Sequence, residues 1–242
     1  MNKVILVTGA SCGFGQMIAE QLAACGHRVF GTSRRPLPDM GQVRMLVLDI
    51  TDEALVERAV TQVIAEAGRI DVLINNAGVG LCGAVEDTTL AEAQWQMDTN
   101  FFGPVRMIRA VLPHMRSRNY GKIINIGSTA GEWPYPGGNT YGATKAFVRQ
   151  FSLNLRADLA GTALRVTDVE PGLCAGTEFS NVRFHGDDEK AAKVYQDVQA
   201  LTAEDIADTV HWIATRPAHV NVNTIELMPV AQSFADLTIQ RG

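Results

Sequence analysis

Seven short apolar stretches spread along the whole chain restrict its possible folds more than any other feature. Nearly continuous runs of Val, Ile and Leu, without a polar residue at every second position, are typical of strands buried on both faces. Such strands occur in parallel sheets that helices cover on both sides. The expected strands are Val4–Val7, Arg28–Thr32, Met45–Asp49, Val72–Asn75, Lys122–Ile126, Arg165–Val169 and Thr224–Met228.

The segments between these stretches have the spacing of helices. From Gln16 to Cys25 the apolar residues recur every three or four positions, and Gly26 stands where a C-terminal cap is expected. A second helix is predicted after Thr51, which can cap its start, and Gly68 is predicted to end it. Strands that alternate with helices indicate parallel neighbours joined by helical crossovers.

We therefore predict an α/β protein with a single Rossmann-type, doubly wound parallel sheet of about seven strands flanked by helices. No linker, repeat or low-complexity segment divides the chain, so residues 1–242 are expected to form one domain. The stretch 172–190 is rich in Gly, Ser, Asn and Asp and has little periodicity. It is predicted to be a mobile lid.

Composition indicates in which environment the chain works and which kinds of partner it lacks. No apolar stretch approaches the roughly 20 residues of a membrane span, and Met1–Val7 is too short for a secretory signal. We therefore expect a cytoplasmic protein that does not enter membranes. The net charge of -5, without a long basic run, argues against nucleic acid as a partner. None of the four cysteines has metal-ligand spacing, so no metal site is predicted.

A glycine-rich loop joins the first predicted strand directly to a helix. Backbone N–H groups at a helix N-terminus can approach a pyrophosphate closely only where Cβ atoms are missing, so the loop is a candidate dinucleotide site. Tight turns use glycine for the same geometry, which is the alternative interpretation. The candidate cofactor residues are Gly9, Ser11, Cys12, Gly13, Phe14 and Gly15.

The end of the second predicted strand indicates which dinucleotide is bound. Enzymes that use NAD usually place an Asp or Glu here to hold the ribose 2′-hydroxyl, but this chain has Arg34 and Arg35. Two guanidinium groups can form charge-assisted hydrogen bonds with a 2′-phosphate. NADP is therefore the predicted cofactor, and the alternative is a pair of solvated surface arginines.

Tyr141 and Lys145 stand one turn apart in a segment, Thr140 to Leu159, whose apolar residues suit a helix. Moving a hydride between a carbinol carbon and a nicotinamide requires a general acid and base for the oxygen-bound proton. A tyrosine with a pKa of about 10 is poorly matched to neutral pH, and a neighbouring ammonium group lowers that pKa. Taken in isolation, such a pair would be a surface coincidence.

Ser128 follows the fifth predicted strand, at the carboxyl edge of the sheet where open α/β folds bind ligands. Its hydroxyl group is a candidate to hold the substrate oxygen, although a serine after a strand is usually a helix or turn cap. Asn100 lies in a helical stretch before Phe101 and Phe102, and its alternative interpretation is an ordinary surface amide.

The order of these motifs resembles that of the short-chain dehydrogenase/reductase family. The resemblance rests on the G-x-x-x-G-x-G spacing of Gly9, Gly13 and Gly15, on Asn75–Gly78, and on Pro171-Gly172, as well as on Asn100, Ser128 and Tyr141-x-x-x-Lys145. It covers essentially the whole chain. It implies that Asn100, Ser128, Tyr141 and Lys145 are the catalytic residues, and that the lysine also holds the nicotinamide ribose.

The same resemblance implies further contacts with the cofactor. Asp49 and Ile50 would border the adenine, and Asn76 would lie against a ribose. The segment from Pro171 to Phe179 would close over the nicotinamide side. The additional residues expected in the cofactor site are Asp49, Ile50, Asn76, Ala77, Gly78, Pro171, Gly172 and Thr177.

Within that family, the stretch from Ile123 to Arg183 looks like the bacterial NADP-dependent 3-hydroxy acid dehydrogenases, also known as serine or L-allo-threonine dehydrogenases and malonic semialdehyde reductases. This implies a small substrate with a carboxylate, and self-association as a homotetramer. Trp133 and Tyr135 are candidates to wall the substrate pocket, and Arg183 to bind the substrate carboxylate. Simple loop packing and a solvated arginine are the alternatives. A reductase of other small aldehydes or ketones, or a catalytically silent NADP-binding sensor, are the rival functions.

Overall fold

The computed structural model describes residues 2–176, 189 and 194–234. Seven parallel strands form one sheet with the order β3-β2-β1-β4-β5-β6-β7. The strands are β1 (Val4–Val7), β2 (Arg28–Ser33), β3 (Val43–Val47), β4 (Val72–Asn75), β5 (Gly121–Ile126), β6 (Leu164–Pro171) and β7 (Thr224–Leu227). The described helices are α1 (Gly13–Ala24), α2 (Glu53–Ala67), α3 (Leu90–Met97), α4 (Gly103–Ser117), α5 (Asn139–Asp158) and α8 (Ala203–Thr215).

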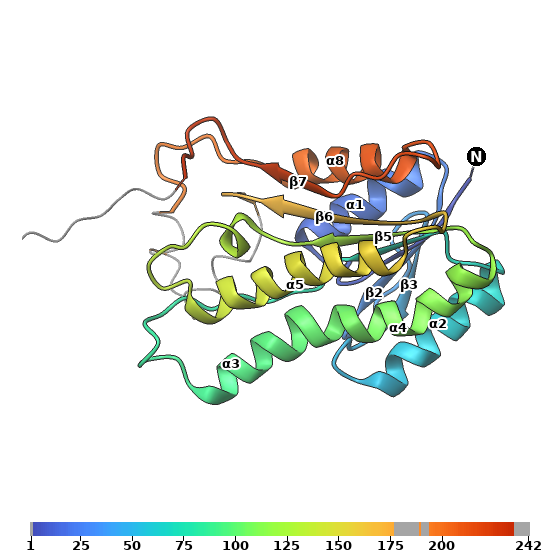
Figure 1. The fold of residues 1–242 in the computed structure, drawn as a ribbon, viewed down its shortest axis with the longest axis horizontal. Coiled ribbons are helices and arrows are strands. Elements are labelled where there is room, and N and C mark those ends of the chain that lie inside the picture. The colour runs from blue at the N-terminus through green and yellow to red at the C-terminus, as the bar shows by residue number, and fades with distance from the viewer. Residues whose placement is uncertain (1, 177–188, 190–193, 235–242) are drawn as a thin grey trace, which may run out of the picture.

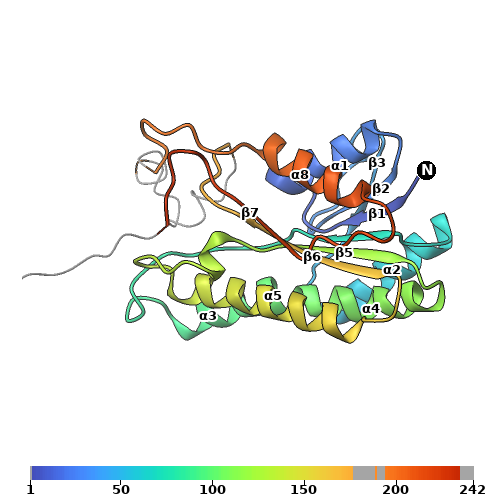
Figure 2. The same cartoon turned by 45° about the horizontal axis from the view of Figure 1, so that its top comes forward.

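Helices cover both faces of this sheet, which confirms the doubly wound parallel fold (Figure 1). Figure 2 shows α1 and α8 on one side, and α2, α4 and α5 on the other. The side chains of successive β1 residues point alternately to the two helix layers. Val4 and Leu6 belong to the core beneath α2 and α4, whereas Ile5 and Val7 belong to the core beneath α1 and α8. The chain therefore has two apolar cores, one on each face.

The strand order reverses next to β1. From β1 the chain proceeds through β2 to β3 on one side, and then returns to place β4 on the other side. The loops after β1 and β4 therefore leave the sheet in different directions and open a crevice at its carboxyl edge. This crevice is where the glycine-rich loop lies.

Two local predictions need correction. The third strand begins at Val43 and ends at Val47, because Asp49 belongs to the turn that follows: its carboxylate accepts hydrogen bonds from Thr51 N at 2.9 Å and Thr51 Oγ1 at 2.8 Å. Since the hydroxyl group of Thr51 is used in this turn, Asp52 caps α2 instead, accepting from Leu55 N at 3.0 Å. Gly68 ends α2 with φ of 76°, as predicted.

After β6 the chain passes through residues 172–176, where Cys174 pairs with Leu201 in an isolated bridge. Most of the predicted lid, 177–188 and 190, lies outside the described residues, so the lid stays a prediction. Among the described helices, none is long and apolar enough to span a membrane.

Candidate active site

A cleft of about 840 Å³ opens at the carboxyl edge of the sheet. Loops after the first six strands line it, together with α5 and the segment after β7. The predicted residues that line the cleft are Gly9, Ser11, Cys12, Gly13, Phe14, Arg34, Asp49, Ile50, Asn76, Ala77, Gly78, Ser128, Trp133, Tyr135, Tyr141, Lys145, Pro171 and Gly172. Gly15, Arg35 and Asn100 are not among the lining residues, and Thr177 and Arg183 lie outside the described part of the chain.

The glycine-rich loop has the geometry of a phosphate cradle. Gly9 and Gly13 have φ of 65° and 55°, a region that side chains disfavour. A Cβ on Gly15 would lie 2.1 Å from the carbonyl oxygen of Gly9, so this buried glycine lets α1 pack against the loop. The side chain of Cys12 does not cap α1, and the first turn holds no acidic residue. The positive end of α1 is therefore not neutralised by its own first turn.

The loop after β4 is tied to this cradle. Thr8 Oγ1 accepts hydrogen bonds from the backbone N–H groups of Asn76 and Ala77, both at 3.0 Å. Asn76 Nδ2 donates to the carbonyl oxygens of Thr8 and Gly9, also at 3.0 Å. The two loops that flank the crevice are thus joined into one wall. Asn76 faces the cleft while its amide group holds this wall together.

The two arginines after β2 differ in position. Both are exposed, but Arg34 lines the cleft and Arg35 does not. The backbone N–H of Arg35 donates to Ser33 Oγ at 3.2 Å, which turns the chain at this point. A 2′-phosphate in the cleft would therefore have the Arg34 guanidinium nearby, and the contribution of Arg35 stays a prediction.

Tyr141 and Lys145 both lie on α5 and are largely buried, each with 8% of its surface exposed. Lys145 Nζ donates to the carbonyl oxygen of Ile126 at 2.7 Å and lies 5.8 Å from the centre of the Tyr141 ring. Burial lowers the pKa of Lys145 to about 8, against the opposing effect of Asp168. Near neutral pH this amine is thus close to the point where it gains or loses its charge.

Asn100 lies in η1 (Asp98–Phe102), a π-helical turn between α3 and α4, and is 2% exposed. Its Oδ1 accepts from Val79 N at 2.8 Å, and its Nδ2 donates to Val79 O at 2.7 Å and to Thr144 Oγ1 at 3.0 Å. Thr144 precedes Lys145 on α5. The side chain of Asn100 therefore ties α5 to the loop after β4, and the surface-amide alternative is wrong.

Ser128 lies between β5 and η2 (Thr129–Gly131), and its Oγ accepts from Ala130 N at 3.1 Å, as the cap alternative predicted. The same hydroxyl group lies 3.5 Å from Pro171 O and lines the cleft, so capping does not remove it from the site. Trp133 and Tyr135 follow it and line the same cleft. The three predicted substrate-side residues of this loop are therefore brought together with Tyr141.

The sequence did not indicate that the segment after β7 reaches the cleft. Gln232 lines the cleft, and its Oε1 accepts from Leu173 N at 2.7 Å. A Cβ on Gly172 would lie 2.4 Å from this oxygen. On the other side, Trp133 Nε1 donates to Glu226 Oε1 at 2.6 Å, and the Trp133 ring lies 4.4 Å from that of Phe234. These contacts join residues about 60 to 100 positions apart, which no local pattern reveals.

Two other groups of residues are unlike catalytic sites. Burial raises the pKa of Cys174 to about 12, so its thiol stays protonated and unreactive at neutral pH. The ring centres of His27, between α1 and β2, and His211, on α8, lie 6.4 Å apart, and neither residue lines the cleft. Among the described residues, no group of three or more His, Cys, Asp or Glu is placed to hold a metal ion.

Comparison with known sequences and structures gives consistent matches. The family model for short chain dehydrogenase matches residues 3–188. A NADP-dependent 3-hydroxy acid dehydrogenase of Salmonella typhi is 55% identical over 99% of this chain and 100% of its own length. The serine 3-dehydrogenase of Agrobacterium fabrum is 43% identical over 100% of this chain and 99% of its own.

Two solved structures extend these matches to the fold. The closed form of a serine dehydrogenase complexed with NADP+ has a TM-score of 0.94 and 53% identity, covering 99% of this chain and 100% of that one. The crystal structure of serine dehydrogenase from Escherichia coli has a TM-score of 0.83 and 47% identity, covering 96% and 100%. The fold is thus shared over nearly the full length of the chain.

Proposed function

Since this chain belongs to the short-chain dehydrogenase family, we propose that it is an NADP-dependent oxidoreductase that moves a hydride between the nicotinamide and a small 3-hydroxy acid or its carbonyl form. The observation that carries this proposal is the Tyr141–Lys145 pair, which lies at the wall of a cleft whose other end is the glycine cradle. The names of the relatives support the substrate class, which includes serine, L-allo-threonine and 3-hydroxypropionate with its aldehyde, malonic semialdehyde.

The residues present fit NADP. The uncapped start of α1 and the φ angles of Gly9 and Gly13 suit a pyrophosphate, and Arg34 suits a 2′-phosphate. When bound, the nicotinamide supplies or accepts the hydride. Asp49 and Ile50 would border the adenine, and Pro171 and Gly172 the nicotinamide end.

In this proposal Tyr141 donates a proton to the substrate oxygen during reduction and accepts it during oxidation. The Lys145 ammonium group favours the phenolate form of Tyr141 and holds the ribose hydroxyls. Ser128 Oγ holds the substrate oxygen. Asn100 acts as a positioning residue, because its bonds to Val79 and Thr144 set the place of α5 against the loop after β4.

Steady-state kinetics with matched substrates test this proposal. We expect turnover of 3-hydroxypropionate, serine and L-allo-threonine with NADP+, and of malonic semialdehyde with NADPH, each well above that with NAD(H). Propanal and acetone serve as uncharged comparisons. Higher kcat/KM for these uncharged carbonyls would favour the rival small-aldehyde reductase, and NADPH binding without any turnover would favour the sensor.

Cofactor choice has its own test, in which the two arginines are changed separately. Arg34→Ala is expected to weaken NADPH binding by about tenfold or more while leaving NADH binding nearly unchanged, because it removes a charge-assisted pair with the 2′-phosphate. Arg35→Ala is the matched comparison. Equal losses for both cofactors in Arg34→Ala would contradict the assignment.

Arg183 is proposed to bind the substrate carboxylate. Of the described residues that line the cleft, only Arg34 and Lys145 carry a positive charge, and the proposal uses both for the cofactor. A carboxylate needs a further cation, and a guanidinium group binds it in a bidentate manner. Arg183→Gln is expected to raise KM for 3-hydroxy acids while leaving propanal reduction unchanged, and equal changes for both substrates would contradict this role.

The chain is further proposed to be a cytoplasmic, single-domain homotetramer with its lid at about 172–190. Self-association is supported by two exposed aromatic side chains on neighbouring elements, Phe102 with 48% and Phe147 with 49% of their surfaces exposed. Phe101 packs against both rings at 5.1 Å. Light scattering after gel filtration measures the assembly, and Phe147→Glu is expected to reduce its mass.

A further inference from the structure

Two acidic residues of β6 are buried directly behind the proposed catalytic lysine. Asp168 and Glu170 are two positions apart, so their side chains project from the same face of the sheet, toward α5. Their exposed fractions are 0% and 2%. Buried carboxylates are costly unless hydrogen-bond donors or cations compensate them. The proposed reaction, as described above, uses neither residue.

Asp168 lacks such donors. Neither of its oxygens accepts a hydrogen bond from an N–H or O–H group in the described part of the chain. The neighbouring amide, Asn125 on β5, donates to Ser152 Oγ at 2.8 Å and accepts from Asn75 Nδ2 at 2.9 Å. On the remaining side the Asp168 carboxyl group packs against Gly127, where a Cβ would lie 2.6 Å from Oδ1.

The carboxyl group of Glu170 projects from the same face of β6 beside that of Asp168. Two ionised carboxylates are acceptors only, so these two groups can form a hydrogen bond only when one of them carries a proton. Burial, followed by the charge of Glu170, raises the pKa of Asp168. Burial also raises the pKa of Glu170, but the bond from Asp168 and the charge of Arg149 oppose that effect. The pair therefore holds one proton between its two carboxyl groups.

The surrounding charges leave this pair with one negative charge. Arg149 Nε, on α5, lies 3.2 Å from Glu170 Oε1 and 2.7 Å from Glu132 Oε2. From β7, Glu226 stands in register with Glu170 and is held by the indole group of Trp133. One guanidinium group thus pairs with two glutamates, and a third glutamate lies beside Glu170. The guanidinium group cannot also neutralise Asp168, which is why retaining one proton on the Asp168–Glu170 pair is favourable.

Lys145 is the other cation near the pair. Its Nζ is held by the carbonyl oxygen of Ile126, the residue before the Gly127 on which the Asp168 carboxyl group packs. The ammonium group therefore has Tyr141 on the cleft side and Asp168 on the side of β6, and the charge of Asp168 raises the pKa of Lys145 against the effect of burial. A negative charge beside a buried amine favours its protonated form.

We propose that Asp168 and Glu170 are positioning residues that share one proton and thereby place a single negative charge behind Lys145, which keeps its ammonium form facing Tyr141. The role in turnover rests on the proposed function, whereas the shared proton does not. The pair touches neither substrate nor cofactor and acts through Lys145.

Infrared spectroscopy of the protein at neutral pH tests the shared proton without any turnover. The wild type should show the carbonyl stretch of a buried, protonated carboxyl group. Asp168→Asn and Glu170→Gln should each lose it, because the remaining carboxyl group then ionises with an amide donor beside it. Glu226→Gln, an exposed acid of the same cluster, should keep it. Absence of the band in the wild type, or its survival in Asp168→Asn, would overturn the proposal.

The pH dependence of aldehyde reduction tests the effect on Lys145. The reaction needs the ammonium form, so kcat/KM falls as pH rises through the pKa of Lys145. Each single variant retains one negative charge and should leave this alkaline limb in place. The double variant Asp168→Asn/Glu170→Gln removes the charge and should move the limb to lower pH by roughly one unit.

A purely structural pair would change rates without moving the limb. If either single variant moves the limb as far as the double variant does, the two carboxyl groups do not share a proton. If the double variant leaves the limb in place, the pair does not act on Lys145. Either result overturns the proposal. If the protein reduces none of the aldehydes, the proposed function is wrong. The infrared spectra would still show whether the two carboxyl groups share a proton.

Discussion

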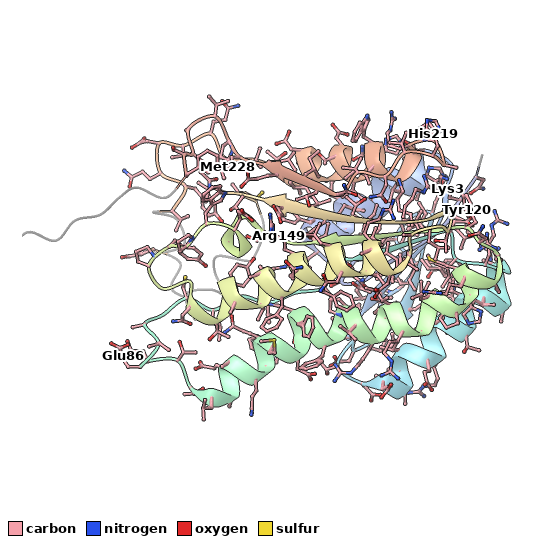
Figure 3. The ribbon with its side chains drawn as sticks, viewed as in Figure 1. Lys3, Glu86, Tyr120, Arg149, His219 and Met228 are labelled. Atoms are coloured by element: carbon pink, nitrogen blue, oxygen red, sulfur yellow. The ribbon has the colours of Figure 1, made fainter. Side chains whose placement is uncertain are left out.

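The two ends of the sheet differ in whether their buried polar residues have hydrogen-bond and ion-pair partners within the protein. Figure 3 places Lys3, Tyr120 and His219 at the amino end of the strands and Met228 at the carboxyl end. At the amino end, just before β4, Asp71 is 4% exposed and accepts from Val4 N at 2.9 Å. Its carboxylate also accepts from Arg69 at 2.8 Å and Arg118 at 2.7 Å. Both oxygens of this buried carboxylate thus accept hydrogen bonds within the protein.

The buried basic residues of the amino end also have backbone partners, although Arg165 Nε itself has none among the described residues. Lys122 Nζ donates to the carbonyl oxygen of Ile213, in the last turn of α8. Arg165 Nη1 donates to the carbonyl oxygens of Arg216 at 3.0 Å and Pro217 at 3.1 Å, just after that helix. Both side chains lie at the negative end of the α8 dipole, which favours their charged forms against the effect of burial.

At the carboxyl end the protein leaves polar groups without such partners. The start of α1 has no side-chain cap, Lys145 has a carbonyl partner but no direct ion pair among the described contacts, and Asp168 lacks an N–H donor. The difference shows that paired charges at the amino end stabilise the fold, while the carboxyl end keeps its donors and charges for a ligand and a proton.

The largest effect is expected at the carboxyl end, on turnover alone. Tyr141→Phe keeps the ring but removes the transferable proton, so kcat/KM should fall by about 10²- to 10⁴-fold. NADPH binding, measured by fluorescence titration, and thermal unfolding should stay close to those of the wild type. A variant that retains more than half of the turnover would show that this end does not carry the chemistry as proposed.

The next effect is expected at the amino end, on stability alone. Asp71→Asn removes a buried charge from two guanidinium groups and should lower the free energy of unfolding by about 2 kcal/mol. Although burial opposes it, bonds from Val4, Arg118 and Arg69 lower the pKa of Asp71. Its contribution is therefore present above pH about 4 and is lost as pH falls through the folded-state pKa.

Urea unfolding at several pH values measures this contribution. Asp39→Asn, an exposed acid that also pairs with an arginine, is the matched control and should change stability less. KM and kcat of Asp71→Asn should equal those of the wild type under conditions where both are folded. A selective loss of kcat would show that the amino end affects turnover as well as stability.

Lys122 gives the amino end a pH dependence of its own. Burial, with the charges of Arg165, Lys3 and Arg216, lowers its pKa from 10.5 to about 7. The unfolded chain then binds more protons between these values, so this residue makes stability rise with pH in that window. Between pH 7 and 9 the stability of the wild type relative to Lys122→Met should increase by on the order of 1–2 kcal/mol. Denaturant unfolding at both pH values measures it, and a pH-independent difference would contradict this pKa.

The smallest effect is expected from the C-terminal wall of the cleft. Gln232→Leu removes the acceptor for Leu173 N, so the segment after β6 should be held less firmly and KM should rise about fivefold with kcat unchanged. Val230→Ala, at an exposed position of the same segment, is the control. Loss of kcat in Gln232→Leu, or equal effects in both variants, would show that Gln232 does not position the cleft.

Local patterns in the sequence were enough to predict most helices and strands and the part of the site that lies on single elements. A helix is stabilised by residues three and four positions apart, and a glycine ends it locally, so α2 was found from its apolar stripe and Gly68. Tyr141 and Lys145 are also four positions apart, so their place on one helix could be predicted in the same way. The strand β3 and the cap of α2 were misplaced because the turn in which Asp49 accepts from Thr51, and Asp52 from Leu55, cannot be recognised from apolar spacing.

Contacts between distant segments depended on the packed fold. Asn100 was predicted as a site residue from the family resemblance alone, and its surface-amide alternative stayed open because nothing near it in the chain shows that Val79 and Thr144 surround it. Gln232 and the Asp168–Glu170 pair were not anticipated for the same reason. Composition and periodicity establish which residues form strands, helices and a nucleotide loop, since these depend on neighbours along the chain. Burial and partners set the protonation of Lys145 and Asp168, and those arise only when β5, β6 and α5 pack together.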